Sequence, residues 1–151
     1  MIRKATIHDV RPIHALLQDF AKDGELLGRP LSEIYDHLRD FSVHIDQKTG
    51  ELDGCLALSV CWEELAEVRS LAVKRELWNR GIGSRLLSFS LKEAGELGIK
   101  RLFALTYRPY FFEKHGFRQT EKNNLPLKIW SDCVKCVKFP DCDELAVERL
   151  L

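Results

Sequence analysis

The stretch that decides the fold reads Trp78-Asn79-Arg80-Gly81-Ile82-Gly83-Ser84-Arg85. It follows an apolar run at 65–73 and precedes a helical pattern that continues to about residue 97. A strand, a glycine loop and a helix in this order aim backbone N–H groups and the positive end of a helix dipole at an anion. The two glycines let the backbone approach such a ligand closely, and Arg80 and Arg85 add positive charge. We therefore predict that the loop binds a phosphate-bearing molecule.

Other interpretations of this loop remain open at this point. Two glycines also suit a plain helix entry around a tight turn. A dinucleotide-binding fold would place its loop in the first strand–helix unit and would add a third glycine, which is missing here. A P-loop requires Gly-Lys-Ser/Thr, whereas Gly83 is followed by Ser84 and Arg85. Both of these phosphate-loop patterns fit poorly.

The composition indicates one domain in a reducing environment. The chain has 151 residues, enough for a single core, with 23 basic and 23 acidic side chains. This balance gives no general attraction to nucleic acid or to a membrane surface. No segment is as long as a membrane span, and the N-terminus lacks the apolar core of a signal peptide, so we expect a cytoplasmic protein. Five cysteines, an odd number, favour reduced thiols over a disulfide scaffold.

Hydrophobic periodicity and turn residues predict alternating helices and strands. Strands are expected at 2–5, 41–45, 54–62, 65–73, 101–105 and from 116, and helices at 6–22, from 32, from the loop to about 97, and at 109–115. Thr6 and Asp9 are expected to form a capping box, and Gly98 to end the long helix. The pattern predicts one α/β (α+β) domain over 1–151 around a mixed sheet, with 131–151 as a cysteine-bearing extension.

These motifs resemble the GCN5-related N-acetyltransferase (GNAT) superfamily. In that family the fourth strand is followed by Gln/Arg-x-x-Gly-x-Gly/Ala, which wraps the pyrophosphate of acetyl-coenzyme A, and the matching positions here run from Trp78 to Gly83. Trp78 departs from the family pattern and removes one polar group. The order of elements matches over residues 1–120. The resemblance implies a mixed, mostly antiparallel central sheet flanked by helices on both faces.

The resemblance also implies which residues bind acetyl-CoA. Backbone groups of the fourth strand would bond the pantetheine arm, and an N–H near Leu71 would polarise the acetyl oxygen. The loop would hold the pyrophosphate. The expected coenzyme-binding residues are Leu71, Ala72, Val73, Trp78, Asn79, Arg80, Gly81, Ile82, Gly83, Ser84 and Arg85.

A narrower resemblance links residues 102–108, 111–117 and 125–130 to the acetyltransferase domain of bacterial N-acetylglutamate synthase. The ending at 132–144 resembles short, single-domain forms of that enzyme. The resemblance implies direct transfer of acetyl from acetyl-CoA to the α-amino group of L-glutamate in a ternary complex, the first step of arginine biosynthesis. The expected partner is a small amino-acid substrate. The oligomeric state is left open, with a homodimer as one option.

Glu67 stands where many superfamily members keep a general base. An ammonium group cannot attack a thioester, so a base must remove a proton, directly or through water, before the amine adds to the acetyl carbonyl. An ordinary ion pair with Lys or Arg is the alternative for this glutamate. Strand alternation is expected to place Glu67, Arg69, Leu71 and Val73 on one face and the residues between them on the other.

The general acid for the departing thiolate is less defined. Many family members carry a tyrosine four residues before the Gly of Gly116-Phe117, and Phe112 occupies that position here. Tyr107 and Tyr110 are the nearby candidates, with Thr106 or a water as alternatives. Packing is the competing interpretation, since tyrosines at helix starts commonly pack.

Arginine side chains suit the two carboxylates of glutamate. Arg69 and Arg108 are therefore candidates for holding the acceptor. Arg108 lies just past a strand end beside the expected cleft, and Thr106 is a further substrate-binding candidate. Lys128 falls in the segment where longer synthases place substrate-binding residues. A surface salt bridge is the alternative for Arg69.

Three cysteines near the C-terminus, Cys133, Cys136 and Cys142, could be thiolate ligands of a structural zinc ion. Their spacing has one close pair, and a fourth ligand would have to come from elsewhere. Reduced cysteines packed in a C-terminal hairpin are the alternative. Cys55 and Cys61 are interpreted as small core residues.

Two other functions compete with glutamate acetylation. The first is a GNAT acetyltransferase that acts on a different small amine. The second is a non-catalytic module that binds coenzyme A or a metal in a regulatory role, and the departures at Trp78 and Phe112 keep this alternative open.

Overall fold

The computed structural model describes residues 1–24, 28–125 and 144–151. Its strands are β1 (Ile2–Lys4), β2 (Phe41–Ile45), β3 (Leu52–Trp62), β4 (Leu65–Val73), β5 (Arg101–Thr106), β6 (Arg118–Thr120) and β7 (Leu145–Leu150). Its α-helices are α1 (Val10–Lys22), α2 (Leu31–Asp36), α3 (Ile82–Leu97) and α4 (Pro109–Glu113). Short 3-10 turns lie at Ile7–Asp9, Leu38–Asp40, Arg75–Leu77 and Lys122–Asn124. The elements predicted up to residue 120 are present, with shifts of a few residues at their ends.

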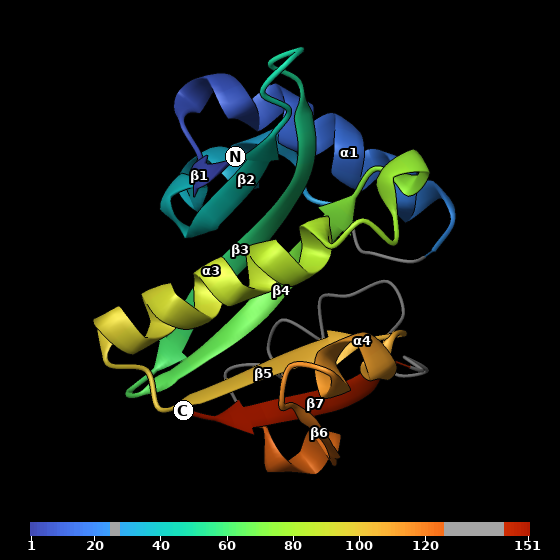
Figure 1. Cartoon of the computed structure of the whole chain (residues 1–151). Coiled ribbons are helices and arrows are strands. Elements are labelled where there is room, and N and C mark those ends of the chain that lie inside the picture. The colour runs from blue at the N-terminus through green and yellow to red at the C-terminus, as the bar shows by residue number, and fades with distance from the viewer. Residues whose placement is uncertain (25–27, 126–143) are drawn as a thin grey trace.

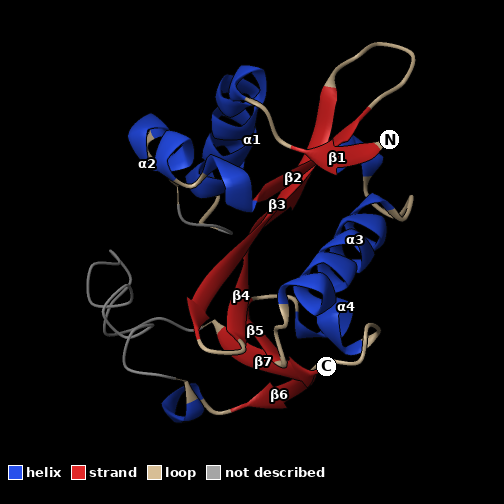
Figure 2. Cartoon of the chain, turned by 90° about the vertical axis from the view of Figure 1, so that its left-hand side faces the viewer, coloured by secondary structure: helices blue, strands red, loops and turns tan. Residues whose placement is uncertain are grey.

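The strands form one seven-stranded sheet in the order β1-β2-β3-β4-β5-β7-β6. Neighbouring strands are antiparallel except β4 and β5, which are parallel. The helices α1 and α2 cover one face of the sheet, and α3 and α4 cover the other (Figure 2). This is the predicted mixed, mostly antiparallel sheet. β7 was not predicted, and it separates β5 from β6.

Each face of the sheet is closed by one amphipathic helix. The helix α1 buries Val10, Ile13, Leu17 and Phe20 against one face. The helix α3 buries Ile82, Leu86, Leu87 and Ala94 against the other. Burying a side chain of leucine size stabilises a fold by about 1.5–3 kcal/mol relative to leaving it exposed. Gly98 follows α3 with a φ of 86°, which is the predicted left-handed helix end.

Gly54 of β3 lets α3 lie close to the sheet. A Cβ at this position would lie 3.0 Å from the carbonyl oxygen of Ala72 and 3.1 Å from a methyl carbon of Leu86. Side chains do not normally pack that closely against backbone. The missing side chain therefore sets how near the first turns of α3 come to β4, and with it the position of the loop before α3.

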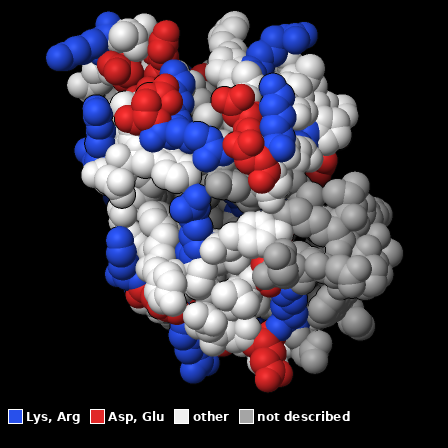
Figure 3. Space-filling model, turned by 90° about the vertical axis from the view of Figure 1, so that its right-hand side faces the viewer, with Lys and Arg blue, Asp and Glu red and all other residues white. Residues whose placement is uncertain are grey.

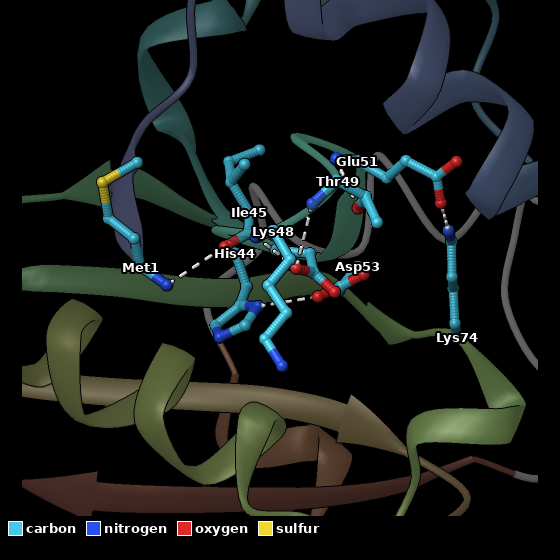
Figure 4. A network of polar contacts seen from close by, with 9 residues as sticks. Met1, His44, Ile45, Lys48, Thr49, Glu51, Asp53 and Lys74 are labelled. Atoms are coloured by element: carbon cyan, nitrogen blue, oxygen red, sulfur yellow. Dashed lines mark hydrogen bonds and ion pairs between the residues drawn. The ribbon is translucent and has the colours of Figure 1, made fainter.

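The β2–β3 hairpin holds the end of β4 in place (Figure 4). Lys74, the first residue after β4, donates its backbone N–H to the carbonyl of Asp53 at 2.9 Å, and its ammonium group lies 3.3 Å from Glu51. His44 lies 3.3 Å from the Asp53 carboxylate. Burial and the positive N-terminus at Met1 lower the pKa of His44, although Asp53 opposes them. The hairpin thus fixes the point at which the glycine loop departs.

Asp9 joins β1 to the start of the first helical segment. Its carboxylate accepts hydrogen bonds from the Thr6 backbone N–H at 2.7 Å and from the Arg3 guanidinium at 2.6 Å. Burial acts to raise the pKa of Asp9, but the bonds from Arg3 and Thr6 outweigh it and hold that pKa below its ordinary value. The predicted capping box between Thr6 and Asp9 is confirmed.

We expect Asp9→Asn to lower the free energy of unfolding by about 1–2 kcal/mol at pH 7, because the charged acceptor is lost and Arg3 is partly screened by solvent. A carboxyl whose pKa is lowered by folding stabilises the protein above its unfolded pKa, and this contribution disappears as the pH falls through the folded value. The difference should therefore shrink below the ordinary pKa of 3.8. Urea unfolding at neutral and acidic pH measures this difference in the free energy of unfolding. The control is Asp19→Asn, because Asp19 is exposed on α1. Equal stability of both variants at pH 7 would contradict the expectation.

A β-bulge interrupts β4 at Ser70. Opposite Leu56 of β3, β4 carries two residues, Ser70 and Leu71. Ser70 has a φ of 54°, in the left-handed region, and the Cys55 thiol donates to its carbonyl at 3.4 Å. One extra residue in a strand exchanges the two faces downstream of it.

The alternation predicted for β4 is therefore wrong beyond the bulge. Val68 lies in the core under α3, so Glu67 and Arg69 face the other way, toward α1 and α2. Leu71 and Val73 pack against the core under α3. They lie on the face opposite to Glu67 and Arg69, because Ser70 shifts the register by one residue.

The strands β4 and β5 pair over only a short stretch and then separate. In the described chain the register pairs Leu65 with Arg101, Ala66 with Leu102 and Glu67 with Phe103, and ends there. The strands then diverge toward their carboxyl ends (Figure 1), while β5 stays paired with β7. Bulges bend the strand that carries them. Among the residues that the structure describes, the ladder between β4 and β5 thus ends at Glu67.

Candidate active site

The glycine loop has the geometry of an anion site. Asn79 and Gly81 have φ values of 67° and 80°, left-handed conformations that asparagine and glycine adopt most readily. Gly81 is the N-cap of α3, and the Arg85 amide donates to its carbonyl at 3.0 Å. The amides of the first three residues of α3 precede this bond and point out of the helix N-terminus. The predicted phosphate site thus lies at the positive end of a 16-residue helix.

The helix α4 packs against this N-terminus from the side of β5. A Cβ at Gly83 would lie 3.4 Å from the Phe111 ring, and His115 Nε2 lies 3.0 Å from Ser84 Oγ. Burial and the charge of Arg149 lower the pKa of His115, which favours the neutral imidazole. Lys and Arg side chains lie among Asp and Glu side chains on this side of the molecule (Figure 3). The contacts of Phe111 and His115 place α4 directly beside the N-terminus of α3.

Trp78 is anchored on several sides. Its indole N–H donates to the carbonyl of Val73 at 2.8 Å, and its ring stacks on Phe20 with 6.1 Å between centroids. The guanidinium carbon of Arg108 lies 4.5 Å from the centroid of the indole ring. In place of the polar side chain usual in the family, the loop begins with a ring that joins α1, the end of β4 and the β5–α4 turn.

Glu67 lies where β4 and β5 separate. It is the last residue of β4 that pairs with β5, and it is 9% exposed. Its Oε1 lies 3.6 Å from Arg69 Nε. The ion pair considered as the alternative for Glu67 is therefore present. The structure also brings a predicted base and a predicted substrate-binding arginine together on one face.

Arg29 joins this pair, and sequence reasoning misses it. The side chain is 4% exposed, and its guanidinium lies 3.4 Å from Ser70 Oγ and 3.7 Å from Glu33. It also lies over the Phe41 ring, 5.2 Å from the centroid. Arg29 Nε is buried without a hydrogen-bond partner among the residues that the structure describes. A buried donor without a partner is costly, so this site is suited to an incoming acceptor atom.

Arg29 is surrounded by charges of both signs. Burial and the charge of Arg69 lower the pKa of Arg29, while Glu33, Asp40 and Glu67 act in the opposite direction. Two neighbouring guanidinium groups are stabilised by a carboxylate placed between them. The only sequence signal for Arg29 is its place in the loop Gly28-Arg29-Pro30 between two helices, and nothing there indicates its burial.

The other predicted residues in the described chain gather at the β5–α4 turn. Thr106 Oγ1 accepts the backbone N–H of Arg108 at 2.8 Å and so shapes this turn. Tyr110 is 75% exposed and Tyr107 is 37% exposed, whereas Phe112 is buried. The roles of the two tyrosines as general acids stay predictions.

Lys128 and the three cysteines Cys133, Cys136 and Cys142 lie outside the described residues, so their predicted roles stay predictions. Across 1–24, 28–125 and 144–151, no group of three or more His, Cys, Asp or Glu side chains could hold a metal ion. Over the same residues no helix has the length and apolar character needed to cross a membrane. Cys55 is buried, and burial raises the pKa of its thiol to about 12, as fits the predicted core residue.

Known proteins are similar to this chain in sequence and in fold. Residues 11–117 match the acetyltransferase (GNAT) family. An uncharacterized N-acetyltransferase of Chlorobaculum tepidum is 38% identical over 150 residues, which cover 99% of this chain and 96% of that protein. An amino-acid acetyltransferase of Mycobacterium tuberculosis is 33% identical over 135 residues, 87% of this chain and 76% of the relative.

A solved structure shows the same architecture. The N-acetylglutamate synthase of Neisseria gonorrhoeae, complexed with coenzyme A and N-acetyl-glutamate, is similar with a TM-score of 0.90 at 29% identity. The similarity covers 100% of this chain and 35% of the synthase, so this chain spans about a third of that longer protein. The loop, the parted strands and the sequence match agree, and the chain belongs to the acetyltransferase (GNAT) family.

Proposed function

We propose that this chain transfers the acetyl group of acetyl-CoA to the α-amino group of L-glutamate. The observation that carries the proposal is the cluster of Glu67, Arg69 and the buried Arg29 beside the point where β4 and β5 separate. A carboxylate supplies a base for the amine, and two guanidinium groups suit an acceptor with two carboxylates. The relatives support it, since one is named an amino-acid acetyltransferase and the similar synthase was solved with N-acetyl-glutamate.

Acetyl-CoA is proposed to bind along β4 and the glycine loop. The amides at the N-terminus of α3 and the helix dipole favour its pyrophosphate. The edge of β4 beyond Glu67 offers backbone groups to the amides of the pantetheine arm. The coenzyme A bound to the similar synthase supports this part of the proposal.

The proposed reaction begins with Glu67, which removes a proton from the acceptor's ammonium group, directly or through water. The amine then forms a C–N bond to the acetyl carbon, and a backbone N–H near Leu71 stabilises the oxyanion. The C–S bond breaks, the nitrogen of the adduct gives up its second proton to water, and the CoA thiolate takes up a proton from Tyr107, Tyr110 or water. The products are N-acetylglutamate and CoA, as in the first step of arginine biosynthesis.

Arg29 and Arg69 are proposed to hold the two carboxylates of glutamate. A carboxylate beside Arg29 would provide the acceptor that its buried Nε lacks in the described structure. It would also offset the repulsion between the two guanidinium groups. An acceptor without a carboxylate would do neither, which is why a simple amine fits this site less well.

Turnover of acetyl-CoA with L-glutamate, L-aspartate, L-glutamine and L-lysine tests the proposal, with mass spectrometry to identify the product. We expect glutamate to give the highest kcat/KM and aspartate, one methylene shorter, to give a value about 10–200-fold lower. Acetylation of another amine, with no rate above background for glutamate, would overturn the acceptor but keep the acetyltransferase. Binding of CoA with no turnover of any amine would favour the regulatory module.

A further inference from the structure

The loop lacks the polar side chain that the family usually places at position 78, and Arg108 lies where it can replace that group. We propose that Arg108 is a coenzyme-binding residue, which supplies from the β5–α4 turn the cation missing at Trp78 and binds the pyrophosphate of acetyl-CoA. The inference rests on the proposed function, because it assigns a contact to the same coenzyme. It differs from the expectation that Arg108 holds the acceptor amino acid.

The backbone of Arg108 is fixed at one end of the loop. Arg108 immediately precedes α4, and its carbonyl accepts the Phe111 N–H at 3.2 Å. The ring of Phe111 lies 3.4 Å from the position of a Cβ on Gly83, which is in the first turn of α3. The start of α4 is thus packed against the helix N-terminus that is proposed to hold the phosphates.

The guanidinium of Arg108 lies at the other end of the loop. It stacks 4.5 Å from the centroid of Trp78, the residue with which the loop motif begins. The Arg108 guanidinium therefore lies at the Trp78 end of the loop, while α4, which Arg108 precedes, packs at the Gly83 end. An exposed cation in this position meets any anion that is seated on the α3 amides.

Trp78 is well suited to hold this guanidinium in place. The Val73 carbonyl and the Phe20 ring both fix the indole, so its free face is a rigid platform. An arginine stacked on an aromatic face keeps its N–H donors in the plane of the guanidinium, where they can bind two phosphate oxygens together. Arg75 also lies near the indole and forms an ion pair with Asp23.

The test compares the wild type with Arg108→Met and with the double variant Trp78→Arg/Arg108→Met. Calorimetry gives the Kd of CoA, and kinetics give the KM for acetyl-CoA, for S-acetylpantetheine and for glutamate. Because a charge-assisted phosphate contact is lost, we expect Arg108→Met to raise the Kd of CoA by about 10–100-fold. The KM for S-acetylpantetheine, which has no pyrophosphate, should stay within about twofold of the wild type, as should the KM for glutamate. The double variant should recover much of the lost affinity, and Arg11→Met, an exposed arginine on α1, is the matched control.

Other outcomes would overturn the inference in distinguishable ways. A raised KM for glutamate with an unchanged Kd of CoA would mean that Arg108 binds the acceptor and not the coenzyme. No change in either would make the stack on Trp78 a packing contact. Equal loss with acetyl-CoA and S-acetylpantetheine would point to the thioester arm instead of the phosphates. A wild-type protein that binds no CoA would instead overturn the proposed function, and the inference with it.

Discussion

Glu67→Gln is expected to lower kcat by about 10²–10⁴-fold. Glutamine keeps the size and polarity of the side chain but cannot take the proton of the ammonium group. The Kd of CoA should change by less than about twofold, because Glu67 faces the α1 and α2 side of the sheet and not α3, whose N-terminus is proposed to hold the coenzyme. Steady-state kinetics at saturating acetyl-CoA measure the first quantity and calorimetry measures the second.

A matched control and a pH profile sharpen this test. Glu63→Gln is the control, because Glu63 is exposed in the turn between β3 and β4. Without a base, only acceptor molecules that are already deprotonated react. The residual kcat/KM of Glu67→Gln should therefore rise about tenfold per pH unit below the pKa of the acceptor amine. Turnover at the wild-type rate would remove Glu67 from the mechanism.

Arg29→Met is expected to raise the KM for glutamate by about 30–5,000-fold, because removing one partner of a buried charge pair typically costs about 2–5 kcal/mol. The KM for acetyl-CoA should stay within about twofold, since Arg29 lies on the α1 side of the sheet and contacts Ser70 and Phe41. Initial rates over a range of both substrates separate the two constants. The control is Arg11→Met, which removes an exposed arginine from the same layer.

The same variant should be no less stable than the wild type. Arg29 is buried beside the like charge of Arg69, and its Nε lacks a partner within the described residues. Methionine of similar length removes that cost and keeps the packing against Phe41. Thermal unfolding checks this expectation. An unfolding temperature well below that of the wild type would mean that Arg29 holds the fold together and that its effect on KM is indirect.

Much of the fold could be predicted because its signals are local. The helices α1 and α3 follow from apolar residues at helical spacing and from the signals at Thr6 and Gly98. The strand β4 and the loop after it can be predicted equally well from the sequence. The bulge at Ser70 cannot be predicted, because a serine in the left-handed region is rare and nothing around it in sequence marks the extra residue. The error in strand faces follows from that single residue.

The candidate site likewise contains residues that could be predicted from the sequence and residues that could not. Glu67 and the loop carry recognisable motifs, and the structure places both beside the parted strands. Arg29 is brought to Arg69 and Glu67 only by the packing of α1 and α2 on the sheet, which no local pattern reports. The stack of Arg108 on Trp78 also depends on tertiary packing, since 30 residues separate the two positions.

The extra residue at Ser70 has a consequence for how such enzymes diverge. Upstream of it, Glu67 and Arg69 face the α1 and α2 side, where the acceptor is proposed to bind, and downstream Leu71 and Val73 face the core under α3. Substitutions at Glu67 and Arg69 can therefore change the preferred amine while the coenzyme edge is inherited intact. Loss of one residue between 68 and 72 would instead exchange the downstream faces and affect both substrates together. If the proposed function holds, the bulge thus lets the residues for the acceptor and those for the coenzyme change independently along one strand.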